Sequence, residues 1–240
     1  MEAYWLGTVP YRAACALQQR LVQERAARSI GDVLLLLEHP PTITLGRAAR
    51  REHILASDET LASLGVDVIE TDRGGDVTFH GPGQLVGYLI LDLTNLRRDV
   101  GWYLRSLEQT LIAVCERLGI AARTFPPHTG VWVEDRKIAA IGIRVKRWVT
   151  SHGFALNVHD VSSWFRLIVP CGIIGCGVTS LEQELGLTPE PGYVRRVTAD
   201  ACKSTFRTTA PLTADTANFS SARIVRIMAE TLDTAAVALL

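Results

Sequence analysis

The chain has 240 residues, 48% of them hydrophobic, and its 25 basic residues balance its 25 acidic residues. This apolar fraction indicates a globular protein and excludes a disordered one. A formal net charge of zero excludes a global field that attracts nucleic acid or an anionic membrane, so we expect neither as a partner. Residues 1–10 lack the pattern of a secretory signal, and no stretch approaches the ~18 continuous apolar residues of a membrane span. We expect a cytoplasmic protein.

The first third of the chain alternates helical and extended patterns. Residues 11–27 place Ala14, Leu17 and Leu21 on one helical face, and 33–37 is an apolar run of strand length that leads into two prolines. Strands are expected at 42–45, 66–70 and 85–93, and a short helix at 58–64. Residues 73–84 contain four glycines and a proline, which predicts a loop with special backbone geometry.

The second part begins with the clearest helix, 102–118, whose apolar residues form one stripe. Strands follow at 131–133 and 138–145, joined by a polar turn, and at 153–158. The capping-box spacing of Thr179 and Glu182 predicts a short helix. Residues 208–217 are expected to form a loop, and about 221–240 a helical tail. These elements predict one α/β domain over 1–240, with a mixed β-sheet flanked by helices.

Five cysteines without a signal sequence argue against a disulfide framework, so each thiol fills the core or does chemistry. Cys15 and Cys115 lie on apolar helix faces and read as core. Cys171 stands between Pro170 and Gly172, on a constrained and approachable turn, where a thiolate can attack a thioester. An ordinary thiol has a pKa near ~8.5, so a nucleophile here needs a cation. Lys137 is the candidate, although its position alone favours a solvated turn lysine.

Two further readings of these segments stay open at this level. Cys171 and Cys176 have C-x4-C spacing, but no nearby Cys/His cluster completes a zinc set, and we expect no metal. The glycine-rich segment 73–84 can bring backbone N–H groups close to an anion or a carbonyl oxygen. It lacks the ending of a phosphate-binding P-loop, and the plainer reading is a tight turn between strands.

Six segments, taken in order, resemble the octanoyltransferase family of lipoate biosynthesis. The most specific is Arg73-Gly74-Gly75-x-x-Thr78-Phe79-His80-Gly81-Pro82-Gly83-Gln84-x-Val86-x-Tyr88. The others are 34–47, 129–132, 137–143, 152–157 and 169–181, so the resemblance covers roughly residues 30–185. The family has the α/β fold shared with biotin and lipoate protein ligases, which is the fold expected here.

The resemblance implies that an octanoyl group moves from octanoyl-acyl carrier protein to a lysine of a lipoyl domain. The implied acceptors are the E2 subunits of 2-oxoacid dehydrogenases and the glycine cleavage H protein. Cys171 becomes the acyl-thioester nucleophile, and Lys137 lowers its pKa. We expect no cofactor, because a thioester is already activated, and we expect a monomer. The implied acyl site comprises Arg73, Gly74, Gly75, Asp76, Val77, Thr78, Phe79, His80, Ala140, Ile141, Gly142, Gly153, Phe154 and Ala155.

Two rival functions remain. An ATP-dependent lipoate or biotin protein ligase of the same fold has no use for a nucleophilic cysteine, which disfavours it. A non-catalytic module that binds an acyl chain or a carrier protein predicts an ordinary thiol at Cys171. The basic run of Arg144, Lys146 and Arg147 could dock an acidic carrier protein, although a solvated charged edge is the favoured reading, because most exposed charges have no partner.

Overall fold

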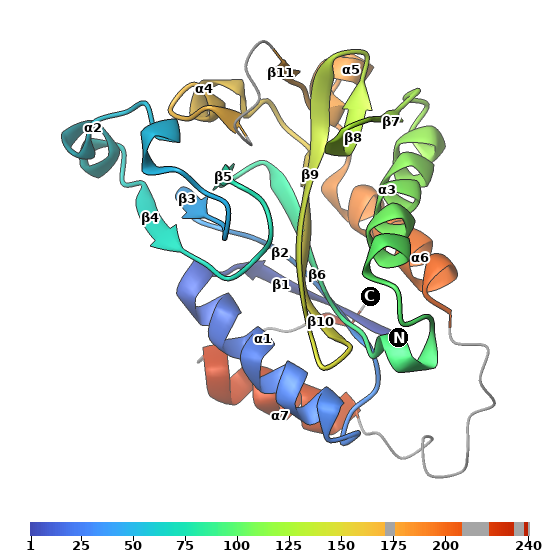
Figure 1. Cartoon of the computed structure of the whole chain (residues 1–240). Helices are drawn as coiled ribbons and strands as arrows, with labels where there is room; N and C mark the ends of the chain where they lie inside the picture. Colours follow the sequence, from blue (N-terminus) through green and yellow to red (C-terminus); the bar gives the residue numbers. More distant parts are fainter. Residues whose placement is uncertain (171–175, 208–220, 233–237, 240) are drawn as a thin grey trace.

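The computed structural model describes residues 1–170, 176–207, 221–232 and 238–239 (Figure 1). Within this part of the chain the largest element is a nine-stranded sheet. Its order is β12 (Ala238–Leu239), β1 (Glu2–Thr8), β2 (Val33–Glu38), β6 (Gln84–Ile90), β10 (Val149–Asn157), β9 (Arg136–Lys146), β8 (His128–Val133) and β7 (Arg123–Phe125), and β11 (Gly177–Val178) pairs with β9. The pairs β1–β2 and β9–β11 are parallel and the others antiparallel, so the predicted mixed sheet is confirmed.

Helices cover both faces of this sheet (Figure 1). Helices α1 (Tyr11–Ala26) and α7 (Ser221–Leu232) pack on one face, and α3 (Val100–Arg117) and α6 (Pro191–Thr205) on the other. Strand β2 shows why its sequence is continuously apolar: Leu34 and Leu36 point into one core, and Leu35 and Leu37 into the other. No helix in the described ranges has the length and apolar character to cross a bilayer.

A second, three-stranded sheet stands beside the large one. It consists of β4 (Asp67–Glu70), β3 (Thr42–Leu45) and β5 (Val77–His80). Helices α2 (Asp58–Ser63) and α4 (Ser162–Phe165) help to cover its own apolar core, where Phe79 stacks on Trp164 with ring centres 5.0 Å apart. The backbone N–H of Gly74 donates to Ile143 O of β9 over 2.9 Å, which ties the loop before β5 to the large sheet.

Most predicted elements are confirmed to within a few residues, and the structure adds several that were not predicted. Residues 77–80 are strand β5 rather than loop, because Val77 and Phe79 alternate with Thr78 and His80 despite the flanking glycines. Strands β1, β7, β11 and β12 and helices α4 and α6 were not predicted, and β12 lies where the helical tail was expected to continue. Helix α5 (Leu181–Leu185) is capped by Ser180, whose hydroxyl accepts from Gln183 N, one residue later than predicted.

Short 3₁₀ turns at Arg51–His53 and Leu93–Asn95 complete the described elements. The predicted loop at 208–217 lies outside the described residues. The predicted helical tail is α7, after which β12 pairs antiparallel with β1.

Candidate active site

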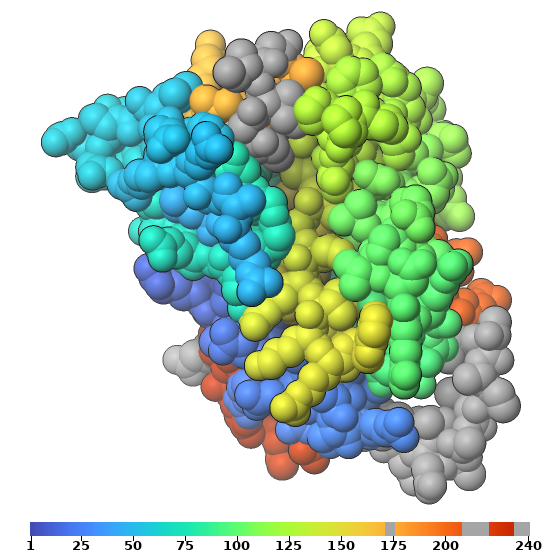
Figure 2. Space-filling view, in the orientation of Figure 1, coloured from blue at the N-terminus to red at the C-terminus, as the bar shows by residue number. Residues whose placement is uncertain are grey.

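A cavity of about 230 Å³ lies between the two sheets, and we refer to it as the inter-sheet cavity. In Figure 2 its position corresponds to the crevice between the cyan segments of the small sheet and the yellow-green segments of β8 and β9. Its walls come from α1, the segment 73–80, β6, the β7–β8 turn, β9 and β10. The lining residues are Tyr11, Arg73, Gly75, Asp76, Thr78, His80, Tyr88, Pro127, His128, Thr129, Lys137, Ala140, Ile141, Gly142, His152, Gly153, Phe154 and Ala155.

Lys137 lies at one end of this cavity on β9, and its side chain is buried, with 6% of the residue exposed. Its ammonium lies 4.8 Å from the centre of the Trp132 ring, so an aromatic face partly replaces water around the charge. Gly130 passes close to the lysine stem, because a Cβ there would lie 3.4 Å from Lys137 Cε. The lysine is therefore a packed residue of the cavity rather than a solvated turn residue.

The chain that follows residues 171–175 is joined to Lys137. Gly177 and Val178 pair in parallel with Arg136 and Lys137, and Thr179 N donates to Lys137 O over 3.0 Å. On the preceding side, Val169 N donates to His53 O over 2.7 Å. Cys171 itself lies outside the described residues.

Arg73 fixes the glycine-rich segment against the small sheet. Its buried guanidinium donates to Thr44 O and to Asp76 O, each over 2.8 Å, and to Thr44 Oγ1. Gly46 lies against this cluster, because a Cβ there would come within 2.3 Å of Gly75 O. The planar guanidinium of Arg73 thus holds the segment 73–76 through several hydrogen bonds at once. A lysine ammonium could not make the same set of bonds.

Small residues from two paired strands form the apolar part of the cavity. Ala140 faces Ala155 across β9 and β10, and Gly142 faces Gly153. A Cβ at Gly153 would lie 2.2 Å from Gly87 O, so only glycine allows β6 and β10 to approach this closely. Phe154 packs its ring over Gly87, where a Cβ would meet the ring at 2.2 Å. The result is a slot lined by short side chains along β9.

The end of the cavity away from Lys137 is aromatic and polar. Tyr11 stacks on His80 with ring centres 5.7 Å apart, and Tyr88 lies edge-on to His152 at 6.0 Å. The nearby His39 donates from Nδ1 to Val9 O over 2.6 Å and accepts from the Tyr88 hydroxyl at Nε2 over 2.7 Å. Burial lowers the pKa of His39 and His152 to about 4 and holds the pKa of His80 well below its usual value. These imidazoles are therefore neutral near pH 7.

The structure brings most residues of the predicted acyl site together around this cavity. All but three of them line it, and the exceptions are Gly74, Val77 and Phe79. Val77 and Phe79 point from the opposite face of β5 into the core of the small sheet, as strand alternation requires. The inference that these three touch an acyl chain is therefore not supported by their placement.

Six lining residues were absent from the predicted site: Tyr11, Tyr88, Pro127, His128, Thr129 and His152. Tyr88, Thr129 and His152 stand inside the segments that resemble the family, so the motif boundaries already pointed to them. Tyr11 begins α1 and carried no such signal. Only the packing of α1 against the sheet places it here.

The remaining cysteines differ sharply in environment. Cys115 and Cys202 are fully buried, as expected for core residues, whereas Cys15 is only partly buried and lines an open hollow beside α1, so its expected place in the core is wrong. Burial raises the pKa of the Cys15 thiol to about 11 and of the other two to about 12. Cys176 is free and partly exposed. In the described residues, no group of three or more His, Cys, Asp or Glu side chains is arranged to hold a metal ion.

Sequence comparison identifies the class of domain that carries this cavity. The family model "Lipoyl protein ligase A/B catalytic domain" matches residues 10–207, which include all the lining residues. The lipoate-protein ligase A structure bound with ATP covers 98% of this chain and 95% of its own, with a TM-score of 0.68 and 16% sequence identity. At this identity the likeness establishes the fold alone, and it confirms the predicted fold class.

Proteins with higher sequence identity show which family within this class the chain belongs to. The octanoyltransferase of Myxococcus xanthus is 49% identical over 212 residues, which are 86% of this chain and 59% of that protein. The octanoyltransferase of Geobacter metallireducens is 50% identical over 194 residues, which are 81% of this chain and 88% of that protein. Identity of this degree over most of the chain places it among enzymes that transfer an acyl group: the chain belongs to the octanoyltransferase family.

Proposed function

We propose that this enzyme transfers an octanoyl group from octanoyl-acyl carrier protein to a lysine of a lipoyl domain, through a thioester on Cys171. The observation that carries the proposal is the buried ammonium of Lys137 at the end of a cavity whose next residues along β9 are small and apolar. A cation in this position favours a thiolate nearby, and an apolar slot accepts a hydrocarbon chain.

The pairing of β11 with β9 supports Lys137 as the partner of Cys171. Val178, seven residues after Cys171, lies opposite Lys137 in this pairing. The described chain that follows Cys171 thus pairs with the strand that carries Lys137, although 34 residues separate Cys171 from Lys137 in sequence. Thr129 and His128, at the start of β8, line the same cavity as Lys137.

The first half-reaction forms a carbon–sulfur bond and breaks another. The Cys171 thiolate attacks the carbonyl carbon of the octanoyl thioester, and the carrier's sulfur leaves and takes a proton from Lys137. In the second half, the neutral amine of the acceptor lysine attacks the Cys171 thioester. An amide forms, the amine gives up a proton through Lys137, and the Cys171 sulfur is released. A thioester is already activated, so neither half requires ATP.

The octanoyltransferase relatives and the shared fold support a lipoyl domain as acceptor. We propose that the acceptors are the lipoyl domains of 2-oxoacid dehydrogenase E2 subunits and the glycine cleavage H protein. The reaction is placed in the cytosol, because a thiol nucleophile needs a reducing compartment. An ATP-dependent ligase is disfavoured, since the relatives that share half of their residues with this chain are octanoyltransferases.

Intact-mass spectrometry after incubation with octanoyl-acyl carrier protein tests the mechanism. We expect one octanoyl adduct on the unaltered enzyme, none on Cys171→Ser, and slow formation on Lys137→Ala. Cys176→Ser is the matched control, because it removes a partly exposed thiol five residues away and should leave the adduct intact. An adduct that survives Cys171→Ser, or that disappears in Cys176→Ser, contradicts the assignment of the nucleophile.

A further inference from the structure

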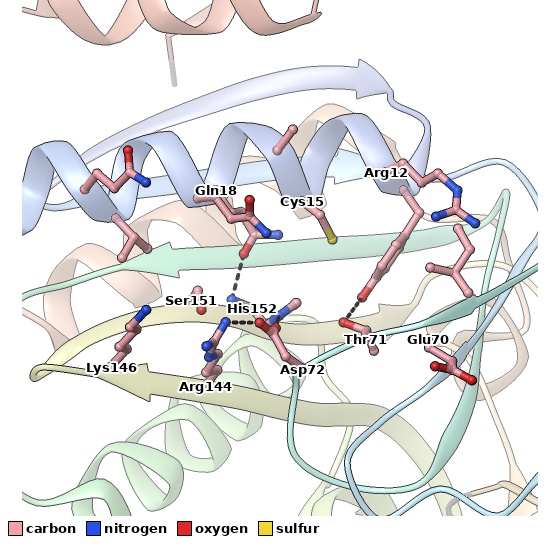
Figure 3. A pocket seen from close by; sticks show the side chains of 16 residues that line it. Arg12, Cys15, Gln18, Glu70, Thr71, Asp72, Arg144, Lys146, Ser151 and His152 are labelled. Carbon is pink, nitrogen blue, oxygen red and sulfur yellow. Dashed lines mark hydrogen bonds and ion pairs between the residues drawn. The ribbon is translucent and has the colours of Figure 1, made fainter.

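A second hollow adjoins the inter-sheet cavity and shares part of its wall. This hollow, which we call the α1 groove, has a volume of about 780 Å³ and lies between α1, residues 69–72 and the β9–β10 hairpin (Figure 3). Two residues, Tyr11 and His152, line both hollows. They stand between the smaller cavity and the much larger groove, and we refer to them as the Tyr11–His152 wall.

Several hydrogen bonds hold this wall in place. The Tyr11 hydroxyl donates to Thr71 Oγ1 over 3.3 Å, and Nε2 of His152 pairs with Asp72 Oδ1 at 2.9 Å. Asp72 is also ion-paired with Arg144, as Figure 3 shows from the side of the groove. The wall is therefore anchored to the segment that connects β4 to the glycine-rich loop.

The backbone at His152 is unusual. Its φ of 57° lies in the left-handed region, which residues other than glycine seldom adopt. The amide N–H of His152 donates to Gln18 Oε1 of α1 over 2.7 Å, which fixes this conformation. A strained conformation kept at a cavity wall suggests that the position of the imidazole matters to the site.

Strand register gives the direction of the cavity. Lys137 begins the lined part of β9, Ala140 and Gly142 follow, and Ile143 pairs with His152. The Lys137 side chain reaches along the strand to the level of Ala139, because the Cβ position of Gly130 lies 2.7 Å from Ala139 O and 3.4 Å from Lys137 Cε. From Ala139 to Ile143 the strand advances four residues, or about 13 Å. An extended octanoyl chain, about 10 Å long, whose carbonyl carbon lies beside the Lys137 ammonium therefore passes the small residues and reaches the Tyr11–His152 wall.

The chemistry of the distal end changes from apolar to polar. Among the described residues, Thr78 Oγ1, His80 Nδ1 and His152 Nδ1 are buried and have no hydrogen-bond partner. A longer hydrocarbon chain would cover these atoms with methylene groups, which is unfavourable because a buried polar group needs a partner. Steric closure and polarity thus both disfavour acyl chains that are longer than octanoyl.

We propose that Tyr11 and His152 are specificity-determining residues that set the upper limit on acyl-chain length, by closing the inter-sheet cavity against the α1 groove. This inference rests on the proposed acyl-transfer function. It assigns the limit to the end of the cavity opposite Lys137. Chains longer than octanoyl are excluded until the wall is opened, and the groove then offers them space.

His152→Gly tests the wall with little expected disturbance of the fold, because glycine adopts a positive φ readily. Rates of thioester formation on Cys171 are measured by mass spectrometry with octanoyl- and dodecanoyl-acyl carrier protein. We expect the dodecanoyl-to-octanoyl rate ratio to rise by about tenfold or more, since single methylene groups in a pocket change such ratios about tenfold or more. A general loss of stability would lower both rates alike and leave the ratio unchanged.

Tyr11→Leu opens the wall from the α1 side and gives an independent second variant. Lys146→Ala is the matched control, because Lys146 lines the α1 groove but not the cavity. We expect its ratio to equal that of the unaltered enzyme. Unchanged ratios in both wall variants, each with a cooperative melting transition, would overturn the proposal, as would an equal rise in Lys146→Ala.

The same experiment separates this inference from the function on which it rests. If the unaltered enzyme forms an octanoyl adduct and the wall variants keep its chain-length ranking, only the role of the wall is wrong. If the unaltered enzyme forms no adduct on Cys171 with any donor, the proposed function is wrong, and the inference is overturned with it.

Discussion

Lys137 and Trp132 are direct partners across β9 and β8, and the ammonium of the lysine lies 4.8 Å from the centre of the indole ring. Both residues are buried, and only 1% of Trp132 is exposed. A cation held over an aromatic face gains ~0.5–2 kcal/mol, with the larger values in desolvated sites. The ring therefore fixes where the charge of Lys137 lies in the cavity, and it is a positioning residue for the proposed reaction.

Trp132→Leu should slow the formation of the octanoyl enzyme by about tenfold to thirtyfold, because the charge loses its aromatic partner. Trp132→Phe keeps a smaller aromatic face and should recover part of this rate. The measurement is single-turnover acylation as a function of pH. A merely structural role predicts that both variants lower the melting temperature without moving the pH profile, and that result would contradict the assignment.

Arg73→Lys should raise the KM for the acyl donor and lower stability. Lysine has one donor group in place of the planar fork that binds Thr44 and Asp76, and each lost hydrogen bond from a charged group costs ~1.5–3 kcal/mol. Urea unfolding and steady-state kinetics measure the two effects. Arg123→Lys is the control, since that exposed guanidinium donates to Glu134 O and lies over the Phe125 ring, and neither residue lines the cavity. Equal losses in both variants would argue against a special role for Arg73.

Gly142→Ala should weaken donor binding more than it weakens the fold. An added Cβ would lie 3.0 Å from Arg73 Cδ and 3.2 Å from Gly74 O, so the cavity wall must shift to accept it. We expect the KM for octanoyl-acyl carrier protein to rise by about tenfold, the value of roughly one methylene group in a pocket. Gly31→Ala is matched to it, because a Cβ there meets nothing within 4 Å. Similar KM values for the two variants would count against Gly142 as part of the acyl site.

Stability should fall as the pH is lowered from 7 to 5. The pKa of His39 is about 4 in the folded protein, chiefly because of burial, against an ordinary value of 6.5. In this window the unfolded chain binds the extra proton and the folded one does not, so protonation favours unfolding. The stability contributed by the depressed pKa is present above pH 6.5 and is lost as the pH falls toward 4. For one such histidine the loss between pH 7 and 5 is about 2 kcal/mol.

The measurement is urea unfolding of the unaltered enzyme and of His39→Gln at both pH values. The variant should lose about 2 kcal/mol less than the unaltered enzyme between pH 7 and pH 5. His152, whose pKa is also about 4, continues to supply part of the remaining pH dependence. An identical loss in the variant and the unaltered enzyme would show that His39 does not supply this dependence.

The sequence predicted correctly those helices and strands in which apolar residues recur at the regular spacing of a helix or a strand. The apolar run 33–37 and the stripe on 102–118 gave β2 and α3 with small boundary errors. Strand β5 was missed because glycines on both sides masked a two-residue period over only four positions. Helix α6 was missed, although Glu190 and Pro191 form an ordinary helix start, with the Glu190 carboxylate accepting from Gly192 N and Tyr193 N.

The site depends on pairing between distant segments, which periodicity does not encode. Lys137 reads from the sequence as a turn residue, and the partners that bury it are Trp132 across the sheet and the glycine at 130. Tyr11 joins the cavity only through the packing of α1 on β10. The motifs predicted most of the remaining lining because their residues occur on strands that are adjacent in the sheet. They could not distinguish the two faces of β5, and the side chains of Val77 and Phe79 pack into the core of the small sheet instead of lining the cavity.

The raised thiol pKa values of Cys115, Cys202 and Cys15 have a practical consequence for studying this enzyme. With pKa values of about 11 to 12, these three thiols remain almost wholly protonated at neutral pH and are slow toward alkylating reagents. In the native chain these three cysteines therefore contribute little to the reaction with thiol-labelling reagents. A single substitution, Cys176→Ser, is enough to turn fluorescent or mass labels into a selective reporter of Cys171, without removing the cysteines that pack the helices.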